Sequence, residues 1–226
     1  SNPTGAVYSE NELRALADIL LKHPHVYIGT DDIYEHINLN GQPFKNILMI
    51  EPKLKDRTII LNGVSKAYSM TGWRIGFAAG PEEIISAMTK LQSQSTSNPT
   101  SISQVAAEAA LRGNQDCIKP MLEAFIERHH YVLETLNSIK GIQCLPSEGA
   151  FYAFADASEA IENLFNKQKI KSRSDLALSE YLLDKKGVAI VPGSAFGSEG
   201  YFRISFATSM ENLKEALSRI KEALES

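Results

Sequence analysis

The chain has 226 residues, 43% of them hydrophobic, and 23 basic against 27 acidic residues give it a net charge of −4. This composition is ordinary for a globular protein with a buried core, and neither nucleic acid nor a membrane is expected as a partner. Two cysteines, Cys117 and Cys144, are too few for a disulfide framework, so we expect a cytoplasmic protein. The chain opens Ser1-Asn2-Pro3-Thr4-Gly5 without an initiator Met, and we expect it to be part of a longer protein.

Helix and strand signals alternate in the first half of the chain. A capping box at Ser9 to Glu12 predicts a helix that runs to about Lys22. A short buried strand is predicted at 26–30, followed by Asp31, and residues 43–55 are expected to be irregular. Strands at 58–63 and 75–80 and a helix at 81–92 complete a pattern typical of an α/β domain. Its sheet should be mainly parallel, with buried, continuous strands.

The second half follows a different pattern. A polar loop is predicted around 92–103, and helices at 101–112 and 119–140. Strands at 151–154, 188–191 and 201–206, with helices at 174–186 and 210–225, indicate an α+β unit. We therefore predict two domains, residues 1–118 and residues 119–226.

Lys66 and Arg74 belong to a loop between two predicted strands. A lysine that follows a buried strand is expected at the carboxyl edge of the sheet, where α/β proteins bind ligands. A neighbouring cation would favour the neutral, nucleophilic amine. Arg74 suits a phosphate, and the Ser65 hydroxyl can bind the same anion. Either cation can instead be an ordinary surface residue.

Asp31 and Tyr34 lie at the end of the first predicted strand. They can serve as a helix cap and a surface aromatic. Alternatively, a buried carboxylate there can keep a heteroaromatic nitrogen protonated, and a phenol can donate to a ring oxygen. Pyridoxal phosphate offers both groups together with an aldehyde and a phosphate.

Arg203 lies between Phe202 and Ile204 in the predicted strand 201–206. It is either an exposed surface residue or a fork for a substrate carboxylate. Asn2 can simply form a turn, or it can direct its amide toward a ligand. The five histidines lack metal-ligand spacing, so no metal site is expected, and we interpret them as structural or surface residues.

Taken in order, these residues resemble the fold-type I pyridoxal-phosphate aminotransferases of class I/II, most of all the bacterial aspartate aminotransferases of the Iβ subgroup. The resemblance covers essentially the whole chain and matches the C-terminal part of such an enzyme. Residues 1–118 would then be the C-terminal part of the enzyme's cofactor-binding large domain, of the α/β class. Residues 119–226 would be its small domain, of the α+β class. The motifs that carry the resemblance are Asn2-Pro3-Thr4-Gly5, Asp31-Asp32-Ile33-Tyr34, Ser65-Lys66-Ala67-Tyr68, Gly72-Trp73-Arg74-Ile75-Gly76 and Phe202-Arg203-Ile204-Ser205.

The resemblance implies a role for each matching residue. Lys66 would be the catalytic lysine that bonds the cofactor aldehyde and then moves the substrate's proton. The cofactor would be held by the pyridinium partner Asp31, by Tyr34 and Asn2 at the ring oxygen, and by Arg74 and Ser65 at the phosphate. The substrate carboxylate would be bound by Arg203 with the help of Asn2.

The implied reaction is transamination of L-aspartate with 2-oxoglutarate by a homodimer. Two departures bear on it: Gly63 stands where some relatives have a phosphate-binding hydroxyl, and the loop 94–100 has no arginine for a distal carboxylate. Alternatives are an aromatic or prephenate aminotransferase, a C–S lyase of the same fold, a lysine enzyme without the cofactor, or an inactive fragment. The fragment reading arises because segments that precede Asn2 in the family are absent from the sequence.

Overall fold

A computed structural model describes residues 1–226 and divides the chain into two compact units. Val7–Leu122 forms one, here called the lysine unit because it contains Lys66. Ser1–Ala6 together with Glu123–Ser226 forms the other, the arginine unit, which contains Arg203. The boundary lies inside one helix, a few residues beyond the expected position. The first six residues belong to the arginine unit, which no sequence pattern indicated. The assignment of the two units as a cofactor-binding domain and a small domain stays a prediction.

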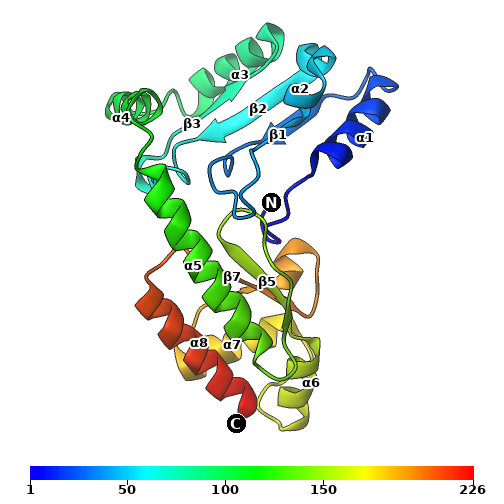
Figure 1. The fold of residues 1–226 in the computed structure, drawn as a ribbon, viewed down its shortest axis with the longest axis vertical. Coiled ribbons are helices and arrows are strands. Elements are labelled where there is room, and N and C mark those ends of the chain that lie inside the picture. The colour runs from blue at the N-terminus through cyan, green and yellow to red at the C-terminus, as the bar shows by residue number, and fades with distance from the viewer. The chain divides into compact units, whose positions relative to one another are not determined.

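The lysine unit contains a three-stranded sheet of order β1-β2-β3 (Figure 1). Strand β2 pairs in parallel with β1, with Gly29 opposite Ile59, and antiparallel with β3, with Leu61 opposite Ala78. The predicted strands are therefore present, and the α/β class expected from the sequence is confirmed. The strand bounds are β1 Ile28–Asp31, β2 Thr58–Gly63 and β3 Gly76–Ala79.

Helices precede and follow this sheet along the chain. The capping box of α1 is present: Ser9 Oγ accepts from the Glu12 N–H, and the Glu12 carboxylate accepts from the Ser9 N–H at 2.8 Å. Residues 43–55, expected to be irregular, instead contain two short helices. One begins after the cap Asn46 and the other has Pro52 as its first residue. The bounds are α1 Glu10–Leu21, α2 Ile47–Ile50, η1 Pro52–Arg57, η2 Thr71–Trp73, α3 Glu82–Ser95, α4 Ser101–Arg112 and α5 Ile118–Asn137.

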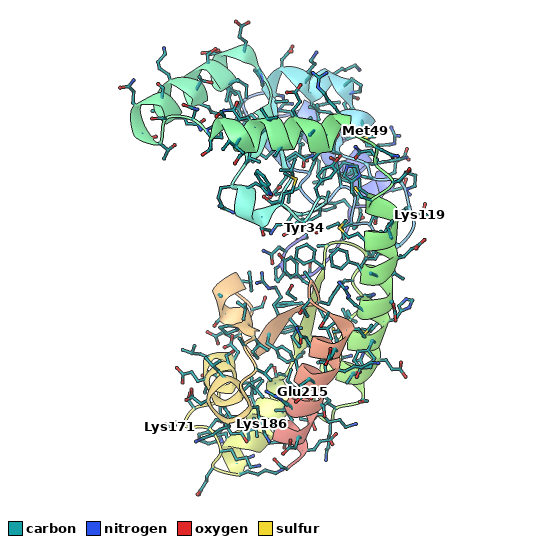
Figure 2. All side chains as sticks on the ribbon, turned by 90° about the vertical axis from the view of Figure 1, so that its left-hand side faces the viewer. Tyr34, Met49, Lys119, Lys171, Lys186 and Glu215 are labelled. Carbon is teal, nitrogen blue, oxygen red and sulfur yellow. The ribbon has the colours of Figure 1, made fainter.

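The expectation of buried strands is only partly correct in the lysine unit. The side chains of Leu61 in β2 and Phe77 in β3 are 41% and 44% exposed. Leu54 and Val64 are fully buried, so the core lies toward η1 and the end of β2. Met49, labelled in Figure 2, is another large apolar side chain that remains exposed. Leu61 pairs with Ala78 and Phe77 pairs with Asn62, so the two exposed side chains point to opposite faces of the sheet. Neither face of this small sheet therefore has the cover that a fully buried strand requires.

The arginine unit contains an antiparallel sheet of order β4-β5-β7-β6. Phe154 of β5 pairs with Arg203 of β7, and Val191 of β6 pairs with the other edge of Arg203. The predicted strand at 188–191 is much shorter than expected, and β4 and helix α6 were not predicted. The bounds are β4 Gln143–Cys144, β5 Tyr152–Asp156, α6 Ser158–Asn166, α7 Asp175–Lys186, β6 Val191–Pro192, η3 Gly193–Phe196, β7 Tyr201–Ser205 and α8 Met210–Glu225.

The core of the arginine unit is made by residues of the sheet and its flanking segments together with helices α5, α7 and α8. Phe206 contacts Phe125 of α5 with ring centroids 6.1 Å apart, and Phe125 stacks on Phe151 at 5.4 Å. Leu182 of α7 and Leu217 of α8 are at most 1% exposed. The α+β class predicted for the second half is thus present. No helix of the chain is long and apolar enough to cross a membrane.

Candidate functional site

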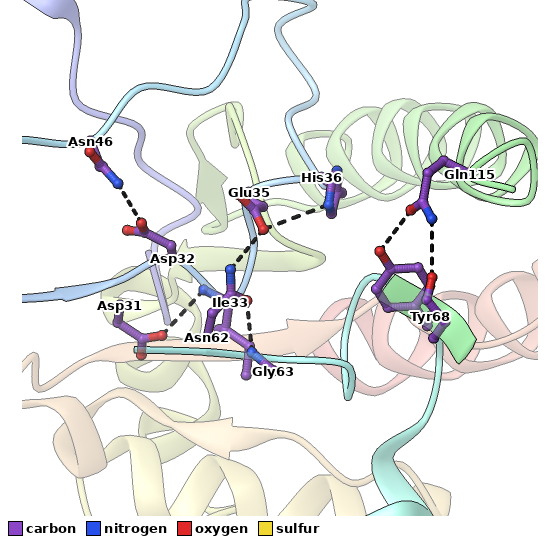
Figure 3. A network of polar contacts seen from close by, with 11 residues as sticks. Asp31, Asp32, Ile33, Glu35, His36, Asn46, Asn62, Gly63, Tyr68 and Gln115 are labelled. Atoms are coloured by element: carbon purple, nitrogen blue, oxygen red, sulfur yellow. Dashed lines mark hydrogen bonds and ion pairs between the residues drawn. The ribbon is translucent and has the colours of Figure 1, made fainter. Parts of the chain in front are cut away.

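The carboxyl end of β1 carries two adjacent carboxylates with different environments (Figure 3). Asp31 is exposed and accepts a hydrogen bond from the Ile33 N–H at 3.3 Å. Asp32 is buried, and its two oxygens accept from Thr30 Oγ1 and Asn46 Nδ2, each at 2.6 Å. The buried carboxylate expected at this strand end is therefore Asp32, because the alternation of β1 turns Asp31 outward. Asp31 remains accessible to a ligand.

Tyr34 lies in the helical turn that follows these carboxylates. The Glu35 N–H donates to the Asp32 carbonyl at 2.9 Å, and the Ile37 N–H donates to the Tyr34 carbonyl at 2.8 Å. Ile37 is 1% exposed and anchors the turn in the core. The structure brings Lys66 to this turn, with its Nζ 5.9 Å from the centroid of the Tyr34 ring. Two residues 32 positions apart in the sequence thus lie close together, while the site role of each stays a prediction.

Lys66 and Ser65 are held by buried neighbours on either side. Val64 and Ala67 are 0% and 4% exposed, so the backbone between them is fixed while the serine and lysine side chains are half-buried. Gly63 ends β2 opposite Gly76. A Cβ at Gly63 would lie 3.2 Å from the Gly76 Cα, so a larger residue there would require a small shift of β3.

Arg74 has a left-handed backbone, with φ 52° and ψ 50°, at the end of η2. Ser69, earlier in the same loop, also has a positive φ of 54°. Such conformations are costly for residues other than glycine and often mark ligand-binding loops. The Arg74 guanidinium is exposed and donates to the Thr71 carbonyl at 2.8 Å. Its remaining N–H groups are available to an anion.

Further polar contacts stabilise the surroundings of the lysine loop (Figure 3). Asn62 of β2 donates to the Glu35 carboxylate at 2.7 Å, joining β2 to the Tyr34 turn. The Tyr68 hydroxyl donates to Gln115 at 2.7 Å, and Gln115 donates to two backbone carbonyls. Burial, and next the Glu35 carboxylate, raise the pKa of Tyr68. These residues form a scaffold that sequence motifs alone did not indicate.

In the arginine unit, Arg203 and Asn2 are in direct contact although they are 201 residues apart. The Arg203 guanidinium donates through Nη1 to the Asn2 Oδ1 at 2.6 Å. Its carbon Cζ lies 4.4 Å from the Tyr152 ring centroid and 5.0 Å from that of Phe196. The Nε of Arg203 is buried and has no hydrogen-bond partner. A guanidinium fixed between two rings with an unsatisfied buried donor is suited to a carboxylate.

The predicted site residues therefore fall into two sets, one in each unit. Lys66 and Tyr34 are in contact in the lysine unit, where Asp31, Ser65 and Arg74 occupy adjacent strand ends and the connecting loop. Asn2 and Arg203 are in contact in the arginine unit. Sequence reasoning did not assign site roles to Asp32, Asn46, Tyr152 or Phe196. Asp32 stands in the motif Asp31-Asp32-Ile33-Tyr34. Tyr152 and Phe196 stand in two further phrases that also resemble the family, Glu148-Gly149-Ala150-Phe151-Tyr152 and Val191-Pro192-Gly193-Ser194-Ala195-Phe196-Gly197.

The groups of the lysine unit fit pyridoxal 5′-phosphate by their chemistry. The strand ends and the strained loop carry an amine for the aldehyde, an accessible carboxylate for the pyridine nitrogen and a phenol for the ring oxygen. A guanidinium and a hydroxyl are present for the phosphate. The contact between Lys66 Nζ and the Tyr34 ring is the observed geometry that supports this fit.

Comparison with known proteins gives one consistent family. The profile of the family described as aminotransferase class I and II matches residues 1–220. An aspartate/prephenate aminotransferase of Nitrosomonas europaea is 60% identical over 224 residues, which are 99% of this chain and 56% of that protein. An aspartate aminotransferase of Rhizobium meliloti is 51% identical over 99% of this chain and 54% of its own length.

Solved structures agree with the sequence comparison. The crystal structure of the aspartate aminotransferase from Rhizobium meliloti superposes with a TM-score of 0.90 at 48% identity, covering 100% of this chain and 56% of that one. The aromatic aminotransferase from Pyrococcus horikoshii gives a TM-score of 0.87 at 35% identity, covering 99% and 57%. The chain thus spans just over half the length of the relatives that it matches.

Proposed function

Because the chain belongs to the class I and II aminotransferases, we propose that the whole protein transfers an amino group from an amino acid to a 2-oxo acid with pyridoxal 5′-phosphate as its cofactor. The proposed substrates are L-aspartate and 2-oxoglutarate, and the products are oxaloacetate and L-glutamate. Relatives named for aspartate support this substrate pair. The members of the family use pyridoxal phosphate, and the lysine unit contains the groups that such a cofactor requires.

The observation that carries the proposal is the state of Arg203. Its guanidinium is positioned by Asn2 and by the rings of Tyr152 and Phe196, and its Nε is buried without a partner. An unsatisfied buried donor costs about 1–3 kcal/mol, which a bound carboxylate would recover through a charge-assisted pair. Amino acids and 2-oxo acids both carry this carboxylate, so one fork serves both substrates.

Five residues of the lysine unit would hold the cofactor and act beside it. Asp31 would accept from the pyridine nitrogen and Tyr34 would donate to the ring oxygen, while Arg74 and Ser65 would bind the phosphate. The bound cofactor supplies an electron sink for the substrate's α-carbon. Lys66 Nζ then removes the proton from that carbon, as a general base within the same loop.

A second substrate is supported by a specific comparison. The relative with 60% identity is named an aspartate/prephenate aminotransferase. Prephenate is a 2-oxo acid with a second carboxylate, and Arg203 would bind its oxo-acid carboxylate in the same way. We therefore include amination of prephenate as the second candidate activity, which a substrate panel separates from aspartate transamination.

We further propose that the whole protein is a cytoplasmic homodimer. The support is the exposed apolar surface of α3 and α4, where Leu91, Ile102 and Val105 are 74%, 68% and 67% exposed. Apolar surface of this kind is typical of protein interfaces. Analytical ultracentrifugation of the whole protein tests the dimer, and a monomer at micromolar concentration would contradict it.

The experiment that tests the proposed activity is a substrate panel with the full-length protein and pyridoxal phosphate. We expect amino transfer from L-aspartate to 2-oxoglutarate. Arg203→Gln should raise the KM for aspartate roughly 10–100-fold, because a charge-assisted hydrogen bond contributes about 1.5–3 kcal/mol. Arg219→Gln, which removes an exposed arginine of α8 paired with Glu215, is the control and should not change KM. A protein that transfers no amino group from any member of the panel refutes the proposal.

A further inference from the structure

A buried histidine of the arginine unit is linked to both partners of the Asn2–Arg203 pair through intervening residues, without touching either one. His129 lies in α5 and is 6% exposed. Its Nε2 accepts a hydrogen bond from the Ser147 N–H at 3.0 Å. Its ring lies 5.7 Å from the ring of Phe206, three residues after Arg203. These contacts are compatible with the structural role expected for His129 from the sequence, and they point to a more specific role.

The first connection leads from His129 to Asn2. Ser147 begins a turn in which the Glu148 and Gly149 N–H groups both donate to the Gly5 carbonyl, at 3.0 and 2.8 Å. The Gly5 N–H donates in turn to the Ser1 carbonyl at 2.9 Å, closing a turn around Asn2. The position of the Asn2 side chain therefore depends on the turn that His129 holds.

Contact between Gly5 and Ser147 makes this connection tight. A Cβ placed on Gly5 would lie 2.5 Å from the Ser147 Cβ, and Gly5 has a φ of +69°. The Ser147 hydroxyl also donates to the Tyr152 carbonyl at 2.6 Å. Tyr152 is the residue whose ring lies against the Arg203 guanidinium. The same turn is thus linked both to the segment that carries Asn2 and to Tyr152, the two groups that contact Arg203.

The second connection leads from His129 to Arg203 through β7. The Phe206 N–H donates to the Phe151 carbonyl at 2.9 Å, which fixes the end of the strand that carries Arg203. Phe206 is fully buried, and its ring packs against both His129 and Phe125. Loss of the His129 ring would leave a cavity beside this anchor.

From these contacts we propose that His129 is a positioning residue, which holds Asn2 and Arg203 in the mutual geometry that binds the substrate's carboxylate. The proposal rests on the proposed function, because it concerns the same fork. His129 does not touch the substrate and takes no part in proton transfer. Its role requires the lone pair on Nε2 to face Ser147 and the proton to be on Nδ1.

The protonation state of the ring agrees with this role. Burial, and next the neighbouring His130, lower the pKa of His129, so the ring stays neutral near pH 7. The groups that contact it from the other elements are the Ser147 N–H and the Phe206 ring, and neither carries a charge. A neutral ring keeps an acceptor available for the turn.

The test compares three variants in the full-length protein with pyridoxal phosphate. His129→Phe keeps an aromatic ring but removes the acceptor, and His129→Gln places an amide oxygen near the position of Nε2. His130→Gln changes the exposed neighbour and is the matched control. The measurements are kcat and KM for L-aspartate, and the dissociation constant of succinate by calorimetry as a probe of the carboxylate fork without turnover.

We expect His129→Phe to raise KM and the succinate dissociation constant about tenfold with kcat nearly unchanged, because a carboxylate contact made in both ground and transition states affects binding alone. His129→Gln should restore both constants to within about threefold, and His130→Gln should change neither. If His129→Phe does not fold, His129→Asn serves instead, since its shorter amide does not reach Ser147, and the same rise is expected.

Two results overturn the proposal in distinguishable ways. An active wild-type protein whose His129→Phe or His129→Asn variant keeps the wild-type KM and succinate affinity refutes the positioning role alone. The same holds if His129→Gln is impaired as much as His129→Phe, because bulk packing would then be the cause. A wild-type protein that neither transfers amino groups nor binds succinate refutes the proposed function, and the role of His129 with it.

Discussion

The two units treat their large apolar side chains differently. In the arginine unit only Leu145, Leu176 and Leu183 are large hydrophobic residues with substantial exposure, whereas the lysine unit exposes such residues on α1, β2, β3, α3 and α4. Conversely, most of the largest fully buried side chains belong to the arginine unit, with Leu217 and Ile220 of α8 among them. The arginine unit therefore has a core of its own, while the lysine unit leaves many of its large apolar side chains exposed.

Within the lysine unit, buried and hydrogen-bonded groups lie at both ends of the parallel strands β1 and β2. Asp32 and Asn46 are buried and hydrogen-bonded to one another, and Leu54 and Val64 are fully buried. Arg57 donates to the carbonyls of Leu20, His23 and Val26 and so closes the end of α1. The turn carrying Asp31 and Tyr34 is therefore anchored by the buried Asp32–Asn46 pair, even though side chains of the sheet beside it are exposed.

The largest expected change in stability comes from a substitution that leaves a cavity in the core of the arginine unit. Leu217→Ala should lower the free energy of unfolding of that unit by about 3 kcal/mol, since Leu217 is 1% exposed. Leu91→Ala in the lysine unit, at a side chain 74% exposed, should change the stability by less than about 0.5 kcal/mol. Urea unfolding followed by circular dichroism measures both, and equal effects would refute the contrast between the units.

A glycine pair gives the next effect. Gly5→Ala should destabilise the arginine unit by about 2–3 kcal/mol, because its φ is +69° and its Cβ would collide with Ser147 and the Gly149 carbonyl. Gly29→Ala, in β1 with nothing within 4 Å of the new Cβ, should be close to neutral. Thermal melts of the two variants side by side test this prediction, and it fails if Gly5→Ala melts like the wild type.

The third prediction concerns Asn46, whose contacts anchor the turn that carries Asp31 and Tyr34 in the lysine unit. Asn46→Ala removes a cap that accepts from Leu48 and Met49 and a donor to buried Asp32, so the loss should be about 2 kcal/mol. Ser209→Ala, which removes only the single cap bond of α8, should cost about 1 kcal/mol. Chemical denaturation measures the loss in free energy of unfolding for each variant. A larger loss for Ser209→Ala would contradict the anchoring role of the Asn46 contacts.

The smallest effect is a pH dependence from His129. Its pKa in the folded unit is below the ordinary value of 6.5, chiefly because of burial. As pH falls below about 6.5 the unfolded chain takes up the proton first, so the stability of the arginine unit should fall with it and stay flat above that range. His129→Gln should weaken this slope, while His23→Gln, at an exposed ring of the lysine unit, should leave it unchanged.

The sequence predicted most elements of the fold because their local signals were strong. The capping box at Ser9 and the β-branched run at 58–63 are examples, and both are present in the structure. The short helices α2 and η1 were missed because each is only a few residues long and is capped by a side chain, Asn46 or Glu51. Helix α6 was also missed; it has no side-chain cap and buries Ala160, Ile161 and Leu164. Exposure of Leu61 and Phe77 was also unforeseen, because a hydrophobic run does not reveal what covers it.

The site residues were predicted by motif, and their supporting contacts were not. Lys66 lies close to Tyr34, and Asn2 is hydrogen-bonded to Arg203, while the role of each residue stays a prediction. Asp31 is exposed and Asp32 is buried. Because the two neighbours are the same residue type, the sequence alone could not show which of them is buried. The relation of His129 to Ser147 and Gly5 joins three distant segments, and no local pattern encodes such a connection.

The central claim is that Lys66 is the lysine that bonds pyridoxal phosphate. The most direct measurement is borohydride reduction of the full-length protein with the cofactor, followed by peptide mapping by mass spectrometry. We expect the reduced cofactor to be covalently attached to Lys66 in the wild-type protein. In Lys66→Ala, both this attached cofactor and the absorption band near the visible edge should be absent. A label on another lysine, or no label on a protein that is folded and saturated with cofactor, would contradict the claim.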